Sequence, residues 1–431
     1  MFNLDVAEWK RVRAICSPIF TSGKLKAMIP LMDRCIDNLL SYIDSKIEES
    51  ERPGFINVKQ TLSGFSIDVI AATTFATDTH ANGVLNKKGV DSSEASDKKT
   101  SDFVHYGTSI FKVPPLKVAA ALCLPRPLLN LLGISTFFSE ASFEFLISLS
   151  RKIFRKRQSS KSKPAVPDLI QLMSENFTTD QALNSSGYDH LTASMDHEPE
   201  EQEKSTVLES KSSGFSQNGS KPNFSSKRML DENEILGQLV LFFFAGFETT
   251  AFTLTTALFE LAHQPEIQER LYCELTSFSD KFNSNKEEYY DQLLNHAPYL
   301  AAVIKETLRK HPNVVRLERR VSAPEGATLG KVHLDQDVLV EVPILAVHHN
   351  PNFYPEPELY NPERFMPENR DRLVPYAYLP FGGGPKNCLG MRFAYQEMKL
   401  CLARVLSRYR FSLAADTPTR LIYAKGAQLL V

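Results

Sequence analysis

The sequence predicts a mainly α-helical fold with a small β region (α+β). Apolar residues recur with helical spacing over long stretches, whereas alternation of apolar and polar residues is confined to short runs such as KVHLDQDVLVEVP. With 431 residues, 42% of them hydrophobic and 23% charged, the chain can bury a large core. This composition excludes a fibrous or wholly disordered protein.

Helices are expected wherever the helical spacing is sustained. Near the N-terminus, Trp9, Val12 and Ile15 share one face, and the pattern continues around Pro30. The expected helical ranges are 4–48, 232–262, 265–280, 298–310 and 389–408.

Four other segments lack a sustained helical pattern. Residues 80–102 are polar and predict a surface loop, and 351–380 is a Pro-rich coil. Residues 103–150 are mostly apolar but broken by four prolines, so short helices with an apolar surface are expected. Residues 175–228 are too polar to offset the entropy of ordering, which predicts a disordered insertion.

Charge and cysteine usage narrow the class of protein. The formal net charge of -2 gives no overall attraction to nucleic acid, and no nucleic-acid partner is expected. The six cysteines are scattered without a CxxC pair, which indicates a reducing compartment. The N-terminal residues show neither a signal peptide nor a membrane span.

The stretch 232–262 is apolar on nearly every side, and two interpretations compete. It has the length of a transmembrane helix, but it also has the composition of a helix at the centre of a protein core. Gln238, Glu248 and five threonines favour burial inside protein, because such groups are costly in lipid.

The run FGGGPKNCLG at 381–390 carries the strongest chemical signal. Cys388 follows three successive glycines and precedes a helical stretch whose free N–H groups favour a thiolate. A buried structural cysteine is the usual interpretation of a lone Cys, but it explains neither the glycines nor Lys386. The glycines permit close approach of the backbone to a flat ligand.

This run resembles the haem-binding loop of cytochromes P450, F-x-x-G-x-x-x-C-x-G, with Phe381, Gly384, Cys388 and Gly390 in register. The resemblance implies haem b, with Cys388 as the thiolate ligand of iron and Phe381 packed over the sulfur. Lys386 stands where the family usually has an arginine that pairs with a haem propionate. A lysine keeps the charge but loses the bidentate geometry, so a weaker contact is expected.

A second motif, AGFETT at 245–250, lies within the apolar helix. Ala245 and Gly246 give close access and predict a local distortion of the helix. By resemblance, Thr249 and Glu248 support proton delivery for oxygen activation. The alternative is that Thr249 bonds back to a carbonyl of the preceding turn.

Two further segments are implied to hold the propionates. Trp9 and Arg13 lie four residues apart on one helical face, matching the W-x-x-x-R helix of the family. In RLERR, Arg319 matches another propionate ligand. Residues 313–318 of this chain are implied to line the substrate side, together with apolar residues near 110–145 and 240–250.

KETLRK contains Glu306 and Arg309, which alone predict a surface ion pair. NPERF supplies Arg364, and the three residues match the Glu-Arg-Arg network that braces the family's fold behind the haem. Their expected role is structural.

The motifs occur in family order and the chain looks closest to microsomal family 3 members. The resemblance implies one P450 domain, with 1–174 and 229–431 as its two parts around the insertion 175–228. The N-terminal part of the fold that precedes the W-x-x-x-R helix in microsomal members is expected to be missing, as in a truncated product.

The implied activity is that of a haem-thiolate monooxygenase that inserts one atom of O2 into a lipophilic substrate. Electrons are expected from NADPH-cytochrome P450 reductase, at the cytosolic face of the endoplasmic reticulum membrane. Four cations are candidate reductase contacts: Lys10, Arg11, Lys399 and Arg404.

Two alternatives from other classes stay open. The first is a truncated, non-catalytic remnant that binds haem or a partner. The second is an isomerase or dehydratase of the same fold, which the presence of both Glu248 and Thr249 disfavours.

Overall fold

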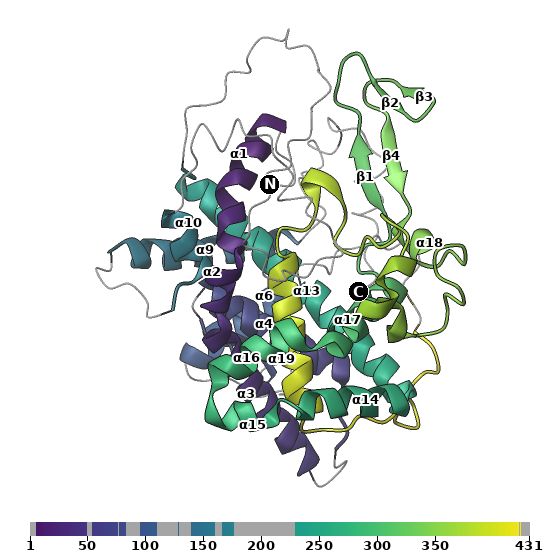
Figure 1. Cartoon of the computed structure of the whole chain (residues 1–431). Coiled ribbons are helices and arrows are strands. Elements are labelled where there is room, and N and C mark those ends of the chain that lie inside the picture. The colour runs from purple at the N-terminus through teal and green to yellow at the C-terminus, as the bar shows by residue number, and fades with distance from the viewer. Residues whose placement is uncertain are drawn as a thin grey trace.

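The computed structural model describes residues 6–49, 54–75, 77–82, 95–109, 128, 139–159, 166–175, 229–421 and 423. Helices form most of this part of the chain, and the short strands gather at one side of it (Figure 1). The predicted class, mainly α with a small β region, is confirmed.

The helices and strands have the following bounds. The first part of the chain contains α1 (Val6–Cys16), η1 (Ser17–Phe20), α2 (Ser22–Lys26), α3 (Ile29–Ile47), α4 (Val58–Phe75), α6 (Ala95–Ser109), α9 (Glu140–Ser159) and α10 (Leu169–Glu175). The second contains α13 (Glu232–His263), α14 (Pro265–Thr276), α15 (Ser279–Ser284), α16 (Lys286–His296), α17 (Pro298–Lys310), α18 (Ile344–His348) and α19 (Met391–Leu406). Between α17 and α19 lie β1 (Leu317–Arg320), β2 (Ala327–Leu329), β3 (Val332–Leu334), β4 (Leu339–Val342), η2 (Pro362–Phe365), η3 (Pro367–Arg372) and η4 (Gly384–Lys386).

Helix α13 is the central element of the helical part. It begins with a capping box, in which Asp231 accepts from the backbone N–H of Glu234 and Glu234 accepts from that of Asp231. It packs against α4, α9, α10, α14, α17 and α19. Of the helices in the described ranges, α13 alone is long and apolar enough to cross a membrane, but Phe243 and Phe247 are buried within the protein. The central-helix interpretation therefore accounts for it.

One hydrophobic core joins the residues before and after the predicted insertion. Its members include Val12 of α1, Phe65 of α4, Phe243 of α13 and Leu400 of α19. Because these side chains share a core, the two parts of the chain pack as one body.

The β region consists of two separate antiparallel pairs. Strand β1 pairs with β4, with Leu317 opposite Val342, and β2 pairs with β3, with Leu329 opposite Val332. Gly330 lies in the left-handed region at φ +61°, which the tight turn between β2 and β3 requires.

The structure corrects several of the predicted boundaries. The helix expected at 265–280 is α14, which ends at Thr276, and α15 begins at Ser279. Residues 95–102, expected in a loop, belong to α6, because burial of Phe103 and Val104 anchors a helix that continues into the polar residues before them. The Pro-rich coil 351–380 contains the short helices η2 and η3. The last helix spans Met391–Leu406 rather than 389–408.

Two predicted segments are only partly covered by the described residues. The insertion lies outside them except for Glu175, which ends α10. Of the apolar segment 103–150, the structure describes the end of α6, Leu128 and the chain from 139 onward, where one long helix, α9, begins.

Candidate active site

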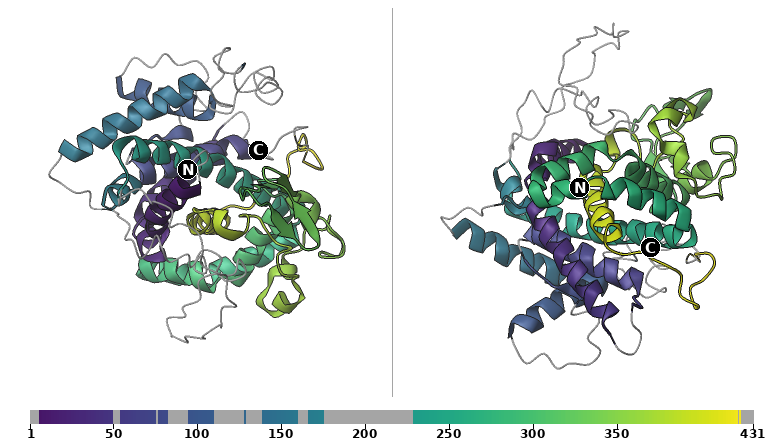
Figure 2. Two further views of the ribbon diagram at one scale, coloured as in Figure 1. Left: turned by 90° about the horizontal axis from the view of Figure 1, so that it is seen from above. Right: turned by 60° about the horizontal axis from the view of Figure 1, so that its bottom comes forward.

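The loop 381–390 lies between α1 and the β1–β4 pair, directly before α19, as both Figure 1 and the left view of Figure 2 show. The backbone N–H of Cys388 donates to the carbonyl of Phe381 at 2.8 Å and closes the loop. Gly382 and Gly384 have φ of +74° and +73°, which a residue with a side chain adopts only with strain. The glycines are therefore needed for the shape of the loop.

The Cys388 side chain is exposed, yet loss of solvation on burial raises the pKa of its thiol. These observations agree if the sulfur lies in a recess with protein around it. The sequence predicted that a helix N-terminus would lower this pKa. Helix α19 begins at Met391, and although the backbone N–H of Gly390 and the charge of Arg13 do lower the pKa, the burial outweighs them.

The ring of Phe381, expected over the sulfur, packs against Tyr395, with ring centroids 5.1 Å apart. It thereby links the start of the loop to the first turns of α19. Packing of this ring over the Cys388 sulfur stays a prediction.

Two of the predicted cations contact this loop from other elements, and a third is part of the loop. Arg13 of α1 donates from Nη1 to the carbonyl of Asn387 at 2.8 Å. Arg319 of β1 donates from Nη2 to the carbonyl of Gly383 at 3.1 Å. Lys386 belongs to the loop itself. The structure thus brings together the groups that the sequence predicted as propionate ligands.

Arg13 is the most buried of these cations, with 6% of its surface exposed. Its Nε has no hydrogen-bond partner, and no carboxylate of the described residues lies within ion-pair distance of it. Burial accordingly lowers the pKa of the guanidinium. A buried cation without a counter-ion is costly, so this position favours an anionic group.

Trp9 lies one turn before Arg13 on α1 and is also buried. The Lys386 ammonium lies 5.2 Å from the centroid of its indole ring, at the distance of a cation–π contact. Trp9 and Lys386 were predicted separately as cofactor contacts, and they contact each other.

The AGFETT segment forms the middle of α13. Ala245 is exposed although its neighbours Phe243 and Phe247 are buried, so this face of the helix borders open space. The Thr249 hydroxyl donates to the Ala245 carbonyl at 2.7 Å, which is the back-bond foreseen as the alternative for this residue. Burial raises the pKa of Glu248, and the charge of Lys59 lowers it to a lesser extent.

Glu306 and Arg309 form a fully buried pair rather than the surface pair that their spacing alone predicts. Arg309 donates from Nε and Nη2 to the two carboxylate oxygens at 2.7 and 2.8 Å, and both side chains are 0% exposed. Arg364 Nε lies 3.6 Å from Glu306 Oε1. The structure therefore brings all three predicted residues of the network together.

Sequence reasoning missed His348, which belongs to the same network. Its Nε2 accepts from the backbone N–H of Leu379 at 2.9 Å, and its carbonyl accepts from Arg309 at 3.0 Å. Burial lowers the pKa of His348 to about 3, so it is neutral. The segment HHNPNF gave no spacing signal that could have identified this role.

The four candidate reductase contacts are mostly not available at the surface. Arg11 and Lys399 are each 3% exposed, Arg11 paired with Glu8 and Glu234 and Lys399 bonded to the Leu294 carbonyl. Arg404 pairs with Asp33 and Asp37. The predictions for Arg11 and Lys399 were wrong, because each cation is buried by partners from distant elements that its own segment does not reveal. The prediction for Arg404, which is partly exposed, stays a prediction.

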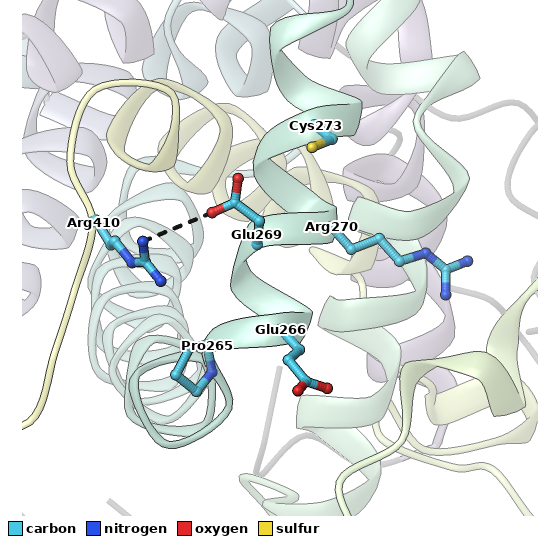
Figure 3. A pocket seen from close by; sticks show the side chains of 6 residues that line it. All are labelled: Pro265, Glu266, Glu269, Arg270, Cys273 and Arg410. Carbon is cyan, nitrogen blue, oxygen red and sulfur yellow. Dashed lines mark ion pairs between the residues drawn. The ribbon is translucent and has the colours of Figure 1, made fainter.

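An open groove lies elsewhere, on α14 and the chain after α19. Figure 3 shows its lining, which includes the exposed Cys273 and the Glu269–Arg410 pair, whose charged atoms are 4.0 Å apart. None of the predicted site residues lines it.

The predicted site fits a large planar cofactor with acidic groups. Arg13 offers a buried charge for which the described residues supply no carboxylate partner, and Ala245 is exposed on α13 between buried neighbours. A Cβ added at Gly384 or Gly390 would meet no atom within 4 Å. No group of three or more His, Cys, Asp or Glu in the described ranges could hold a metal ion. A metal held by a single protein sulfur within an organic ring agrees with this donor set.

Comparisons with known proteins also indicate a haem-binding family. A model of the family Cytochrome P450 matches residues 1–431. Cytochrome P450 3A41 of Mus musculus is 34% identical over 415 residues, which cover 95% of this chain and 69% of the relative. Cytochrome P450 3A2 of Rattus norvegicus is 33% identical, with 98% and 71% covered. Cytochrome P450 3A56 of Fundulus heteroclitus is 32% identical, with 96% and 71% covered.

The motifs in the loop 381–390, in α1, in α13 and in α17 are thus accompanied by similarity along the entire sequence. This chain belongs to the cytochrome P450 family and is a monooxygenase with haem b as its cofactor.

Proposed function

We propose that the chain inserts one oxygen atom from O2 into a lipophilic small molecule, with Cys388 as the thiolate ligand of the haem iron. The supporting observation is that Arg13 and Arg319 contact the carbonyls of the loop that carries the exposed Cys388. When bound, the haem supplies the activation of O2.

The loop and α1 would hold the cofactor. The Gly390 N–H stabilises negative charge on the Cys388 sulfur, and Arg13 adds a positive charge nearby. Arg13, Arg319 and Lys386 would bind the propionates, with Trp9 supporting Lys386 through its ring face. Phe381, Gly384 and Gly390 would shape the loop beside the macrocycle.

Helix α13 would provide the oxygen side of the site. Ala245 leaves space beside the helix, and Thr249 and Glu248 would hold and move protons there. Glu248 suits this role because burial raises its pKa toward neutrality. The Glu306–Arg309–Arg364 network would brace the fold behind the cofactor.

We also propose a redox partner, a cellular location and a domain organisation for the protein. Electrons would come from NADPH-cytochrome P450 reductase at the cytosolic face of the endoplasmic reticulum membrane. Residues 1–174 and 229–431 would form the two parts of one domain around the insertion 175–228, in agreement with their shared core.

The first test is spectroscopic. Purified protein carrying haem is reduced with dithionite and exposed to carbon monoxide, and wild type should show the red-shifted Soret band of thiolate ligation. Cys388→Ser should abolish that band, and Cys273→Ser, which changes another exposed cysteine, should keep it. Haem without the red-shifted band in wild type would refute Cys388 as the ligand.

The second test is turnover. Wild type with haem, NADPH and reductase should convert a lipophilic coumarin ether to a fluorescent product. Stable haem without any product or NADPH consumption would instead support the non-catalytic alternative.

A further inference from the structure

Asn313 follows α17 by three residues and is 8% exposed. Its Nδ2 donates to the hydroxyl oxygen of Thr253 on α13 at 2.9 Å. Thr253 is 2% exposed, so the bond is shielded from water. A side chain outside α13 is therefore connected to the same face that carries Thr249.

The orientation of the Asn313 amide follows from the proton of Thr253. The Thr253 hydroxyl has one proton, and it donates that proton to the carbonyl of Thr249 at 3.0 Å. Its oxygen can then only accept from Asn313, which places the NH2 group toward Thr253. Hydrogen bonds linked in this way polarise and strengthen each other.

The series continues along α13 to the open part of the helix. The Thr249 hydroxyl donates to the Ala245 carbonyl at 2.7 Å, while the Thr249 backbone carbonyl accepts from Thr253, so the two sets of bonds are joined only through the covalent structure of Thr249. Together they extend from the buried Asn313 side chain to the exposed Ala245. Anchoring the Thr249 carbonyl through Thr253 therefore restrains the turn of α13 that carries the Thr249 side chain.

The Asn313 amide is a poor choice for stability alone. Its Oδ1 is buried and has no hydrogen-bond partner in the described part of the chain. A buried acceptor without a donor is unfavourable, and an apolar side chain of the same size would avoid it. A leucine at this position would fill the same space but could not donate a hydrogen bond to Thr253.

We infer that Asn313 is a positioning residue for Thr249 and acts through the Thr253 hydroxyl. The inference rests on the proposed role of Thr249 in proton delivery. Loss of the Asn313 bond would leave the fold and the cofactor in place but loosen the turn of α13 that carries Thr249, so that electrons are spent on peroxide instead of product.

The experiment compares four variants carrying haem: Asn313→Leu, Thr253→Val, the double variant, and Thr255→Val. Thr255 is the matched control, since its hydroxyl also bonds back within α13, to Ala251 at 2.7 Å, but is not bonded to Asn313. Product and hydrogen peroxide formed per NADPH consumed are measured with reductase and the coumarin ether. The KM for the ether is measured alongside.

Asn313→Leu and Thr253→Val should each lower product per NADPH by about two- to tenfold, the range that one hydrogen bond of ordinary strength represents. Peroxide should rise in compensation, and the double variant should be no worse than either single variant. KM should stay unchanged in Thr253→Val, because Thr253, unlike Asn313, lies outside the ranges expected to line the substrate side. Thr255→Val should match wild type. Additive losses in the double variant, or an equal loss in Thr255→Val, would overturn the inference.

Hydrogen–deuterium exchange of the peptide 245–256 gives a second readout that does not depend on turnover. Asn313→Leu should raise exchange there relative to wild type, and Thr255→Val should not. If wild type lacks turnover but Asn313→Leu shows this change, the proposed activity fails and the positioning inference survives. Unchanged exchange and unchanged product per NADPH in Asn313→Leu would refute the inference alone.

Discussion

Arg13 holds Asn387 at two points. Its Nη1 donates to the backbone carbonyl at 2.8 Å, and its Nη2 donates to the side-chain Oδ1 at 2.6 Å. Asn387 immediately precedes Cys388, so α1 fixes the loop one residue from the sulfur. The same cation that is predicted to bind a propionate therefore also sets the position of the thiolate.

Replacing Arg13 with leucine should consequently weaken haem binding through both functions. Hydrogen bonds to a charged group contribute about 1.5–3 kcal/mol, so loss of the pair should destabilise the loop by about 2 kcal/mol. The haem content per protein, measured as the pyridine haemochrome, should fall. Arg34→Leu is the control, because Arg34 is half exposed and pairs with Asp78 at the surface. Equal haem content in both variants would contradict the prediction.

Thr249→Ala should lower the amount of product formed per NADPH, because it removes the Thr249 hydroxyl from the open face of α13. Positioned proton-transfer groups contribute on the order of 100-fold to rate, so a loss of about 10- to 100-fold is expected. Thr249→Ser keeps a hydroxyl and should recover most of the coupling. The measurement is the ratio of product to peroxide at saturating substrate. A serine variant as impaired as the alanine variant would argue against the hydroxyl as the active group.

Glu306→Ala should severely destabilise the protein. It leaves Arg309, which is 0% exposed, without its carboxylate, and breaking a buried pair from one side costs about 3–5 kcal/mol. The free energy of unfolding in urea, measured with haem bound, checks this value. Asp78→Ala removes one partner of an exposed pair and should change it by about 1 kcal/mol or less. Similar losses in the two variants would be incompatible with the burial of the network.

The sequence predicted best those features that depend on neighbours along the chain. Helix α17 has the predicted bounds, 298–310, because Pro298 occupies its first turn and Pro312 follows its end. The loop around Cys388 was identified from consecutive residues whose glycines serve its local geometry. In both cases the determining interactions lie within a few residues.

Features that depend on distant partners were not predictable in the same way. Arg11 and Arg404 look like surface cations in their own segments, but Glu234 and Asp33 bury and neutralise them from elsewhere in the chain. Asn313 gave no signal because its partner, Thr253, lies on α13, far away in the sequence. Pairing across the fold decides the role of such residues, and a single sequence contains no direct record of it.

Glu397 of α19 predicts an unusual dependence of stability on pH. It is 0% exposed, accepts one hydrogen bond from Ser66 of α4 at 2.9 Å, and has no partner at Oε2 among the described residues. Burial raises its pKa to about 8, with the Ser66 bond lowering it to a lesser extent. The folded protein therefore retains this proton at pH values where the unfolded chain, with a pKa near 4.3, has lost it.

The sign follows from the raised pKa. The contribution of protonated Glu397 to stability is fully present below about pH 4.3 and is lost as the pH rises through about 8. Between pH 5.5 and 7.5 the free energy of unfolding should fall by about 3 kcal/mol from this group, at about 1.4 kcal/mol per pH unit. Glu397→Gln keeps an acceptor for Ser66 and removes the titration, so it should abolish this decrease and be the more stable form at pH 7.5. Glu287→Gln, at a side chain that is 80% exposed, should retain the wild-type slope in urea unfolding. A Glu397→Gln slope equal to that of wild type would show that Glu397 is already ionised in the folded protein.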